Sequence, residues 1–304
     1  MTDDSLKKTL IVLTGPTAVG KTALALDLAS HFGIPIINAD SRQIYRDMKI
    51  GTAAPTEDEL RRVRHYFVGT LSIDEYYSAS IYEQQVVELL EQLFRTSDYA
   101  LMSGGSMMYI DAVCNGIDDL PTVDEHTRAT LKQRLADEGL QSLTDELRQL
   151  DPEHYAVVDL KNPRRVVHAL EICHMTGQTY TSFRLNRRKQ RPFRIVKIAL
   201  NRPREELYER INARVDSMMA QGLPDEARRL YPLRHLNALN TVGYKEMFAC
   251  IDGTWTLDEA TERMKGNTRR YARKQLTWFK RDQDVRWFSP NDYQQIINHI
   301  HSNE

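Results

Sequence analysis

The first third of the chain alternates short apolar runs with amphipathic stretches. "TLIVLTG" precedes "KTALALDLASHF", "IPIINAD" precedes "SRQIYRDM", and "IYEQQVVELLEQLF" precedes "YALMSGG". This alternation of strand-like and helix-like segments predicts parallel βαβ units with crossover helices. Ligands of such sheets bind at the carboxyl ends of the strands. We therefore expect chemistry at Thr14-Gly15, Asp40-Ser41 and Gly104-Gly105.

Beyond about Asp118 the pattern changes to helix starts with recognisable caps. "TVDE" predicts a capping box at Thr122 and Glu125, and the pairs Asp151-Pro152 and Asn162-Pro163 place proline at the first helical position. No strand pattern interrupts residues 122–180, whereas "FRIVKIAL" at 193–200 predicts a strand that rejoins the sheet before further helices. We predict an α/β core of residues 1–117 and 189–304 that carries a helical insertion at 118–188.

Composition narrows the class of protein only slightly. The 304 residues, 41% of them hydrophobic, are enough for a large core, and the net charge of -1 neither requires nor excludes a polyanionic partner. Cys114, Cys173 and Cys250 lie far apart, which argues against a zinc site or a disulfide framework. The chain also lacks an apolar run near the roughly 18 residues of a membrane span. We expect a cytoplasmic enzyme with no membrane partner.

"GPTAVGKT" matches the pattern G-x-x-x-x-G-K-[ST] and follows an apolar strand. In such a loop the glycines let backbone N–H groups point at phosphate oxygens, the lysine adds a mobile positive charge, and the last hydroxyl can hold Mg²⁺. We predict a phosphate-binding loop with Mg²⁺ as cofactor on Thr22, and the loop consists of Gly15, Pro16, Thr17, Ala18, Val19, Gly20, Lys21 and Thr22.

The loop alone leaves the reaction open. An ATP-dependent small-molecule kinase is the first hypothesis, but a Walker-type enzyme should offer a second strand that ends in aspartate, and "YALMSGGS" ends in two glycines. The strand that does end in aspartate is "IPIINADS". Its Asp40 could bind metal, accept a proton or cap the following helix.

Seven blocks of the chain resemble, in order, those of the tRNA dimethylallyltransferases. They are "GPTAVGKT", "ADSRQIYRDMKIGTAAP", "SGGSMMYI", "NPRRVVHALE", "INARVDSMMAQGLPDEARRL", "NTVGYKEM" and "TRRYARKQLTWFKR". The resemblance spans nearly the whole chain and implies a P-loop NTPase-like fold. That family transfers a dimethylallyl group from dimethylallyl diphosphate to the exocyclic N6 of the adenosine just 3′ of the anticodon and releases diphosphate.

The resemblance implies that the loop holds the diphosphate of an isoprenoid, which leaves during the reaction. Three residues would be catalytic: Asp40 as the base beside the adenine amine, and Lys21 and Arg214 as cations on the diphosphate. An arginine suits the diphosphate because its guanidinium binds phosphate oxygens in a bidentate manner. A tRNA-binding module that no longer catalyses transfer is a third reading of the same residues.

The resemblance also implies a tRNA partner, gripped at its anticodon stem-loop with help from the insertion by a monomeric enzyme. The base must leave its stack to reach the diphosphate, so a basic surface is needed. Two basic clusters, at residues 184–194 and 269–281, are candidates. The implied tRNA contacts are Asp40, Ser41, Arg42, Gln43, Ser106, Arg128, Arg164, Arg165, His168, Thr241, Gly243, Tyr244 and Lys245.

Two blocks of the chain depart from the family pattern. "GGSMM" has Ser106 where the family usually has threonine and places Met107 beside two glycines, and Ala54 stands where the family commonly has lysine. These changes leave open the shape of the prenyl pocket and one cationic contact.

Overall fold

The computed structural model describes residues 8–118, 120–184 and 189–302. The chain divides into two compact units, one of residues 1–114 with 190–304 and the other of residues 115–189. The predicted insertion at 118–188 lies within the second unit. Each unit is described separately.

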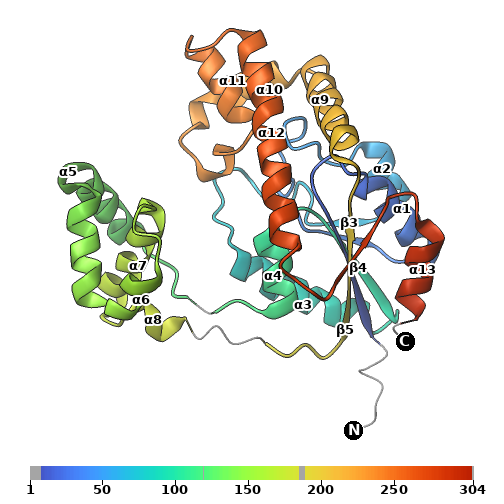
Figure 1. The fold of residues 1–304 in the computed structure, drawn as a ribbon, viewed down its shortest axis with the longest axis horizontal. Helices are drawn as coiled ribbons and strands as arrows, with labels where there is room; N and C mark the ends of the chain where they lie inside the picture. Colours follow the sequence, from blue (N-terminus) through green and yellow to red (C-terminus); the bar gives the residue numbers. More distant parts are fainter. Residues whose placement is uncertain (1–7, 119, 185–188, 303–304) are drawn as a thin grey trace. The chain divides into compact units, whose positions relative to one another are not determined.

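The first unit is built on a six-stranded, all-parallel sheet with the strand order β3-β2-β4-β1-β5-β6 (Figure 1). The strands are β1 (Thr9–Thr14), β2 (Ile36–Asn38), β3 (His65–Tyr66), β4 (Tyr99–Ser103), β5 (Arg194–Leu200) and β6 (Val285–Phe288). The predicted α/β class and the return of 193–200 to the sheet are confirmed. The short strands β3 and β6 were not predicted.

Helices cover both faces of this sheet because the strands are apolar on both sides. Ile11 and Leu13 of β1 pack in one cluster with α1 (Lys21–Phe32) and α13 (Tyr293–His301). Leu10 and Val12 pack in another with α3 (Ala79–Leu93) and α4 (Met107–Asn115). Burial on both faces is the expected environment of a parallel sheet. It leaves the strand ends as the place for polar chemistry.

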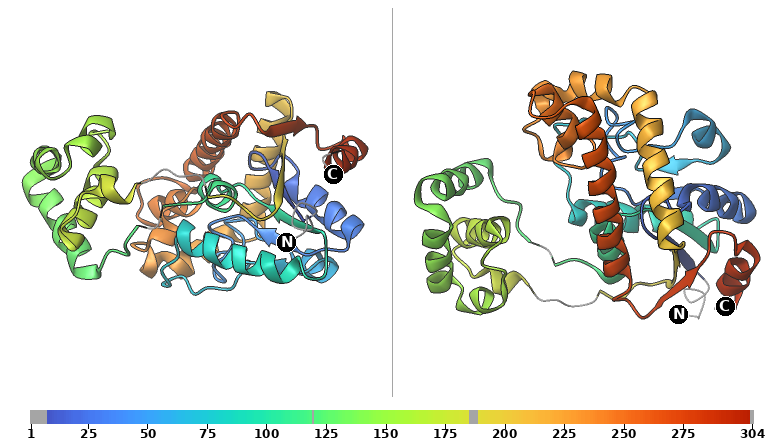
Figure 2. Two further views of the ribbon diagram at one scale, coloured as in Figure 1. Left: turned by 90° about the horizontal axis from the view of Figure 1, so that it is seen from below. Right: turned by 45° about the horizontal axis from the view of Figure 1, so that its top comes forward.

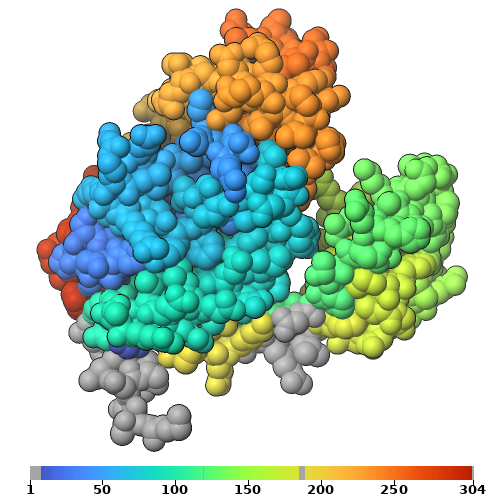
Figure 3. Space-filling view, turned by 180° about the vertical axis from the view of Figure 1, so that it is seen from behind, coloured from blue at the N-terminus to red at the C-terminus, as the bar shows by residue number. Residues whose placement is uncertain are grey.

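A third cluster lies beside the sheet and packs residues 44–73 under a group of helices. Figure 3 shows that segment in blue directly below these helices in orange. The elements after β5 are α9 (Arg204–Ala220), α10 (Leu223–Leu230), η2 (Tyr231–Leu233), η3 (Asn237–Leu239), α11 (Tyr244–Ile251) and α12 (Leu257–Phe279). The long helices α9 and α12 lie side by side (Figure 2). Side chains of both helices can therefore contribute to one site.

One predicted helix is absent. "SRQIYRDM" after β2 forms consecutive turns, and the next helix is the short α2 (Glu57–Arg62). The Asp40 Oδ1 accepts the N–H groups of Arg42 at 2.9 Å and Gln43 at 3.3 Å, a contact that could equally cap a helix. The helix is replaced because the carbonyl oxygens of Gln43 and Ile44 accept N–H groups of residues 69–71, at 2.8–3.0 Å, instead of N–H groups of a following helical turn.

The described part of the second unit is entirely helical, as predicted, with α5 (Glu125–Leu150), α6 (Pro152–Val157), α7 (Pro163–Thr176) and α8 (Tyr180–Phe183). The proline starts of α6 and α7 are confirmed, with Asp151 and Asn162 as their caps. The capping box at Thr122 was wrong. Asp124 caps α5 by accepting the Thr127 N–H at 2.8 Å, which makes Glu125 the first helical residue and not the third. Within the described ranges no helix is long and apolar enough to cross a membrane.

Candidate active site

The predicted phosphate loop lies between β1 and α1, at the carboxyl end of the central strand. Gly15 and Gly20 have φ of +142° and +115°, values that favour glycine, and a Cβ on Gly15 would lie 2.7 Å from the Leu200 carbonyl oxygen. Helix α1 begins at Lys21, so its N-terminal N–H groups and its dipole face the loop. This arrangement binds anions.

The Lys21 side chain folds back against the backbone of the phosphate loop. Its Nζ donates to the carbonyl oxygens of Gly15 and Pro16, both at 2.8 Å. Burial, with a smaller contribution from the positive charge of Arg214, lowers the pKa of Lys21 to about 7. The charge of this lysine therefore depends on pH in the neutral range and on any anion brought to the loop.

Arg214 comes to the same place from α9. Its Nη1 donates to Thr17 Oγ1 of the loop at 3.3 Å. Burial lowers the pKa of Arg214, and the negative charge of Asp40 partly opposes that effect. Two partly buried cations and one carboxylate thus converge on the loop, an arrangement suited to a ligand with two or more negative charges.

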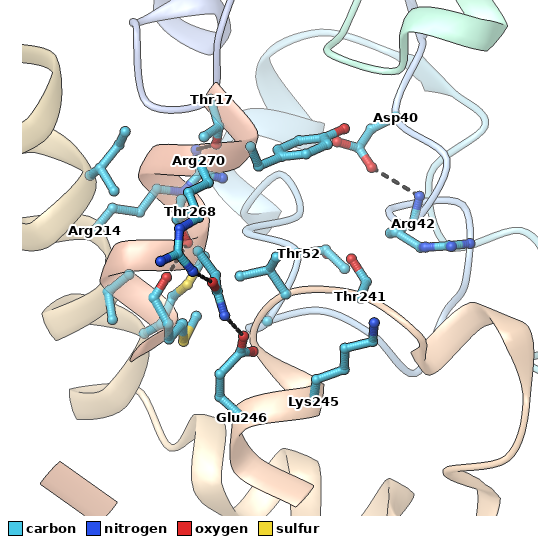
Figure 4. Close-up of a pocket in the computed structure, with 18 of the residues that line it drawn as sticks. Thr17, Asp40, Arg42, Thr52, Arg214, Thr241, Lys245, Glu246, Thr268 and Arg270 are labelled. Carbon is cyan, nitrogen blue, oxygen red and sulfur yellow. Dashed lines mark hydrogen bonds between the residues drawn. The ribbon is translucent and has the colours of Figure 1, made fainter. Parts of the chain in front are cut away.

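Two pockets meet at these residues. The phosphate-loop pocket, of about 600 Å³, reaches from Lys21 and Thr22 to Gly104, Gly105 and His65. The α12 pocket, of about 560 Å³, lies between α9, α11 and α12 (Figure 4). Both are lined by Thr17, Asp40, Arg214 and Tyr271. Groups bound in the two pockets would therefore both lie next to Asp40.

The α12 pocket has an apolar wall and a polar rim. The wall is formed by Ile211, Val215, Met218, Val242 and Met264. Six of the sequence-predicted tRNA contacts line the pocket, namely Asp40, Ser41, Arg42, Ser106, Thr241 and Lys245. Figure 4 shows Asp40 and Arg42 on one segment of the chain and Thr241 and Lys245 on another. An apolar wall with convergent polar groups suits a planar heterocycle.

Tyr244 and Gly243, two of the predicted tRNA contacts, serve the protein interior. Tyr244 is fully buried, and its phenol donates to Glu226 Oε1 at 2.7 Å, so the predicted contact between this side chain and RNA is corrected to a structural one. Gly243 has φ +100° and its N–H donates to Glu246 Oε2 at 2.7 Å. Gln43 lines the phosphate-loop pocket, yet its Nε2 donates to the carbonyls of Thr52 and Ala53.

The remaining predicted contacts belong to the second unit. Arg164 and Arg165 are exposed on the first turn of α7, and Arg128 is exposed on α5. His168 is half-buried, with Nδ1 at 3.2 Å from Glu171 Oε2 and its ring edge-on to Tyr180. The three arginines are the more accessible cations for a polyanion.

The two predicted basic clusters differ. In the first, the nearly buried Arg191 pairs with Glu83 at 2.6 Å, which does not favour the predicted contact with RNA. Arg194 is half-buried and donates to Thr9 Oγ1 at 2.7 Å, and its contact with RNA stays a prediction. Arg187 and Arg188 lie outside the described residues. The second cluster is exposed along α12. Its groove is lined by Met107, Arg270, Arg273, Lys274, Thr277, Trp278 and Arg281.

Of the departures from the family pattern, Ser106 lines the α12 pocket, and Ala54 stands between Ala53 and Pro55, which line the phosphate-loop pocket. Met107, the first residue of α4, lines the α12 groove and packs against one face of the core. Ala54 is held in a turn by its N–H, which donates to the Lys49 carbonyl at 2.9 Å. Neither side chain is among the residues that line the phosphate-loop or α12 pockets.

Sequence reasoning missed Tyr271 and Gln275 as site residues. Gln275 is buried on α12, and its amide binds the loops of the site. Tyr271 is 39% exposed. Burial of its phenol, with the nearby negative charge of Asp40, raises the pKa of Tyr271 to about 12. It is therefore a neutral hydroxyl between the two pockets.

Loop, cations, carboxylate and paired pockets define a P-loop enzyme that handles a phosphorylated substrate. The family model described as IPP transferase matches residues 43–282. A tRNA dimethylallyltransferase 1 of Phocaeicola vulgatus is 62% identical over 97% of this chain and 98% of its own length. One of Bacteroides thetaiotaomicron is 59% identical over 96% and 95%.

Solved structures of tRNA prenyltransferases are also similar to this chain. A full-length tRNA isopentenylpyrophosphate transferase from Bacillus halodurans has a TM-score of 0.71 at 35% identity, with 97% of this chain and 96% of that one covered. A eukaryotic dimethylallyltransferase, described as acting on tRNA, has a TM-score of 0.83 at 25% identity, with 98% and 80% covered. The chain belongs to the IPP transferase family, that of the tRNA dimethylallyltransferases. It is a prenyltransferase, and the kinase alternative is not supported.

Proposed function

We propose that the phosphate-loop pocket binds dimethylallyl diphosphate and the α12 pocket receives the adenine base just 3′ of a tRNA anticodon. The observation that carries this proposal is that the two pockets share Thr17, Asp40, Arg214 and Tyr271. The donor's allylic carbon and the acceptor's amine would then meet beside the Asp40 carboxylate. The products would be N6-(dimethylallyl)adenosine in the RNA and free diphosphate.

Asp40 acts as the base in this proposal. The lone pair of an exocyclic adenine amine is delocalised into the ring, so removal of a proton assists its attack. As the new carbon–nitrogen bond forms, the amine proton passes to the Asp40 carboxylate and the allylic carbon–oxygen bond breaks. One Asp40 oxygen is held by the N–H groups of Arg42 and Gln43, which fixes the orientation of the carboxylate.

Lys21, Arg214 and the loop N–H groups stabilise the charge that grows on the departing diphosphate. This is electrostatic stabilisation by groups already in place before the reaction. Lys21 takes up a proton when the diphosphate binds, because the anion offsets the burial that lowers its pKa. Arg214 stays charged and links the diphosphate to the loop through Thr17.

Mg²⁺ fits the donor set. Thr22 lines the phosphate-loop pocket with Asp40, and Mg²⁺ is commonly held by one or two protein oxygens together with substrate phosphates and water. Among the described residues no group of three or more His, Cys, Asp and Glu side chains could hold a metal ion by itself. Bound at the Thr22 hydroxyl, Mg²⁺ would neutralise charge on the diphosphate.

The anticodon stem-loop is the part of the tRNA that we propose to be bound. The α12 groove, with Arg270, Arg273, Lys274 and Arg281 exposed, offers cations for the phosphates next to the flipped base. Arg128, Arg164 and Arg165 offer further cations in the second unit. We also propose that the enzyme acts as a monomer in the cytoplasm.

The test is transfer of labelled dimethylallyl from its diphosphate to an anticodon stem-loop with an A-A-A run at the anticodon's 3′ edge. We expect Mg²⁺-dependent labelling of the RNA and no reaction with ATP as sole donor. RNA that binds tightly but stays unlabelled would support the non-catalytic reading. Phosphorylation of a small acceptor by ATP would support a kinase.

A further inference from the structure

Gln275 joins two loops of the active site from within α12. Its side chain is 2% exposed, and both ends of its amide are bound. The Oε1 accepts the N–H of Thr17 in the phosphate loop at 2.9 Å, and the Nε2 donates to the carbonyl oxygen of Gly105 after β4 at 2.8 Å. A buried amide with both ends satisfied fixes the distance between the two groups that it binds.

The phosphate-loop end of this bridge leads to a catalytic cation. The N–H of Thr17 donates to Gln275, and its hydroxyl oxygen accepts a hydrogen bond from Arg214 Nη1 at 3.3 Å. A shift of the Thr17 backbone would therefore move the Arg214 partner as well. Gln275 itself also lines the phosphate-loop pocket.

The other end leads to the turn that carries the base. The Gly104 N–H donates to the Leu13 carbonyl at 3.2 Å, and the Ser106 N–H donates to the Ala39 carbonyl at 3.0 Å. A Cβ on Gly104 would lie 2.2 Å from the Ala39 carbonyl oxygen, so the two segments touch directly. Ala39 precedes Asp40. The chain of contacts from Gln275 thus reaches the backbone of the proposed base.

Gly105 and the Gln275 amide are closely packed against each other, which limits the residues that can replace either one. A Cβ on Gly105 would lie 2.5 Å from Gln275 Nε2, so a larger residue at position 105 would displace the amide from its observed position. Glutamate in place of Gln275 would set a carboxylate oxygen against the Gly105 carbonyl oxygen, and methionine would satisfy neither loop. The neighbouring Tyr271, one turn away on α12, lines both pockets.

We propose that Gln275 is a positioning residue for prenyl transfer: it holds the diphosphate loop and the base-bearing turn at the separation the reaction requires. The inference rests on the proposed function. It assigns Gln275 no contact with the donor and no proton to transfer. Its effect comes through Thr17 and Gly105.

The test compares Gln275→Met and Gln275→Glu with Ile297→Val, a buried control on α13 that removes one methyl group from the same unit. Three quantities are measured: the Kd of inorganic pyrophosphate with Mg²⁺ by calorimetry, the Kd of the anticodon stem-loop, and kcat and KM for dimethylallyl diphosphate. Gly105→Ala perturbs the same bridge from its other end.

We expect both Gln275 variants to weaken pyrophosphate binding and to lower kcat/KM by roughly tenfold to a hundredfold, with RNA affinity within about twofold of wild type. Gly105→Ala should lower kcat/KM similarly, and its combination with Gln275→Met should cost less than the two effects multiplied. Pyrophosphate affinity and kcat/KM equal to those of Ile297→Val would overturn the inference. An equal loss of RNA affinity would also overturn it, since that indicates general disruption.

The proposed function and this inference fail separately. If wild-type enzyme transfers no dimethylallyl group, the proposed function fails, and the pyrophosphate affinities still decide whether Gln275 positions the loop. If wild-type enzyme transfers the group but the Gln275 variants match the control, only the inference fails.

Discussion

At the scale of single residues, Asp40 combines two tasks that one substitution can separate. Its Oδ1 holds the turn through the N–H groups of Arg42 and Gln43, and its carboxylate faces both pockets. An asparagine keeps an oxygen acceptor for the turn but cannot accept the amine proton. The turn and the chemistry can therefore be tested independently.

We predict that Asp40→Asn lowers kcat by about 10²- to 10⁴-fold, the usual contribution of a general base, while RNA affinity changes less than twofold. Single-turnover transfer and a binding titration measure the two effects. Asp47→Asn, an exposed aspartate seven residues further along, is the control and should retain wild-type kcat. Wild-type kcat in Asp40→Asn would remove Asp40 from the role of base.

Lys21 makes donor binding sensitive to pH. Because burial lowers its pKa to about 7, the free enzyme loses this charge as the pH rises through 7, and a bound diphosphate must restore it by proton uptake. We predict that wild-type affinity for Mg²⁺-pyrophosphate falls between pH 7 and 9 by up to about tenfold per pH unit relative to Lys21→Arg, whose charge does not titrate. Parallel pH profiles for the two proteins would contradict this account.

At the scale of elements, a buried carboxylate organises the segment that follows Asp40. Glu226 of α10 accepts the N–H groups of Lys49, Ile50 and Gly51 at 3.2, 2.9 and 2.8 Å and the phenol of Tyr244 at 2.7 Å. A Cβ on Gly51 would lie 2.6 Å from the Tyr244 ring, which explains the glycine there. This one side chain joins α10, α11 and the loop before α2.

We predict that Tyr244→Phe lowers the free energy of unfolding by about 1 kcal/mol and Glu226→Gln by about 2 kcal/mol, because the latter weakens several buried hydrogen bonds. Chemical denaturation measures both effects. RNA affinity of Tyr244→Phe should stay within about twofold of wild type. Weaker RNA binding without loss of stability would restore the sequence-based assignment of Tyr244 to the tRNA interface.

Much of the element order could be predicted from the sequence, and the misses have physical causes. β1 and β4 have apolar centres, β5 is apolar except for Arg194 and Lys197, and the phosphate loop between β1 and α1 depends on a local pattern. β3 has two residues and β6 has four, too short for a periodic signal, and their place depends on neighbouring strands. "SRQIYRDM" has a helical pattern, but its backbone pairs with residues 69–71, which are distant in sequence.

The residues of the candidate site likewise fall into those that local sequence predicts and those that only the fold brings together. Lys21, Thr22 and Asp40 follow from the strand ends, since local sequence sets them. Gln275 could not be found, because its partners Thr17 and Gly105 are distant in sequence. Likewise Arg191 has the charge of an RNA contact, but its burial against Glu83 is a property of the fold.

At the scale of the whole molecule, we propose that exposed cations of both units contribute to RNA binding. Arg164 and Arg165 are exposed at the start of α7. We predict that replacing both with alanine weakens stem-loop binding at least about tenfold. The slope of the log of the binding constant against the log of the salt concentration should also fall in magnitude, by about 0.7 for each phosphate that the enzyme no longer neutralises. The KM for dimethylallyl diphosphate at saturating RNA should not change.

Lys132→Ala, which removes another exposed cation of the second unit, is the matched control and should bind RNA like wild type. Equal affinities for the double variant and this control would exclude the start of α7 from the tRNA interface. A salt slope unchanged despite weaker binding would indicate a contact to bases instead of phosphates.

The central claim is that the phosphate loop holds an isoprenoid diphosphate and that an adenine amine displaces it. Its most direct test is mass analysis of nucleosides from a stem-loop incubated with enzyme, Mg²⁺ and dimethylallyl diphosphate, beside a stem-loop with purine riboside in place of the target adenosine. The account predicts one N6-(dimethylallyl)adenosine per diphosphate released, and no product from the RNA that lacks the amine. A dimethylallyl group on another atom, or diphosphate released equally with both RNAs, would contradict it.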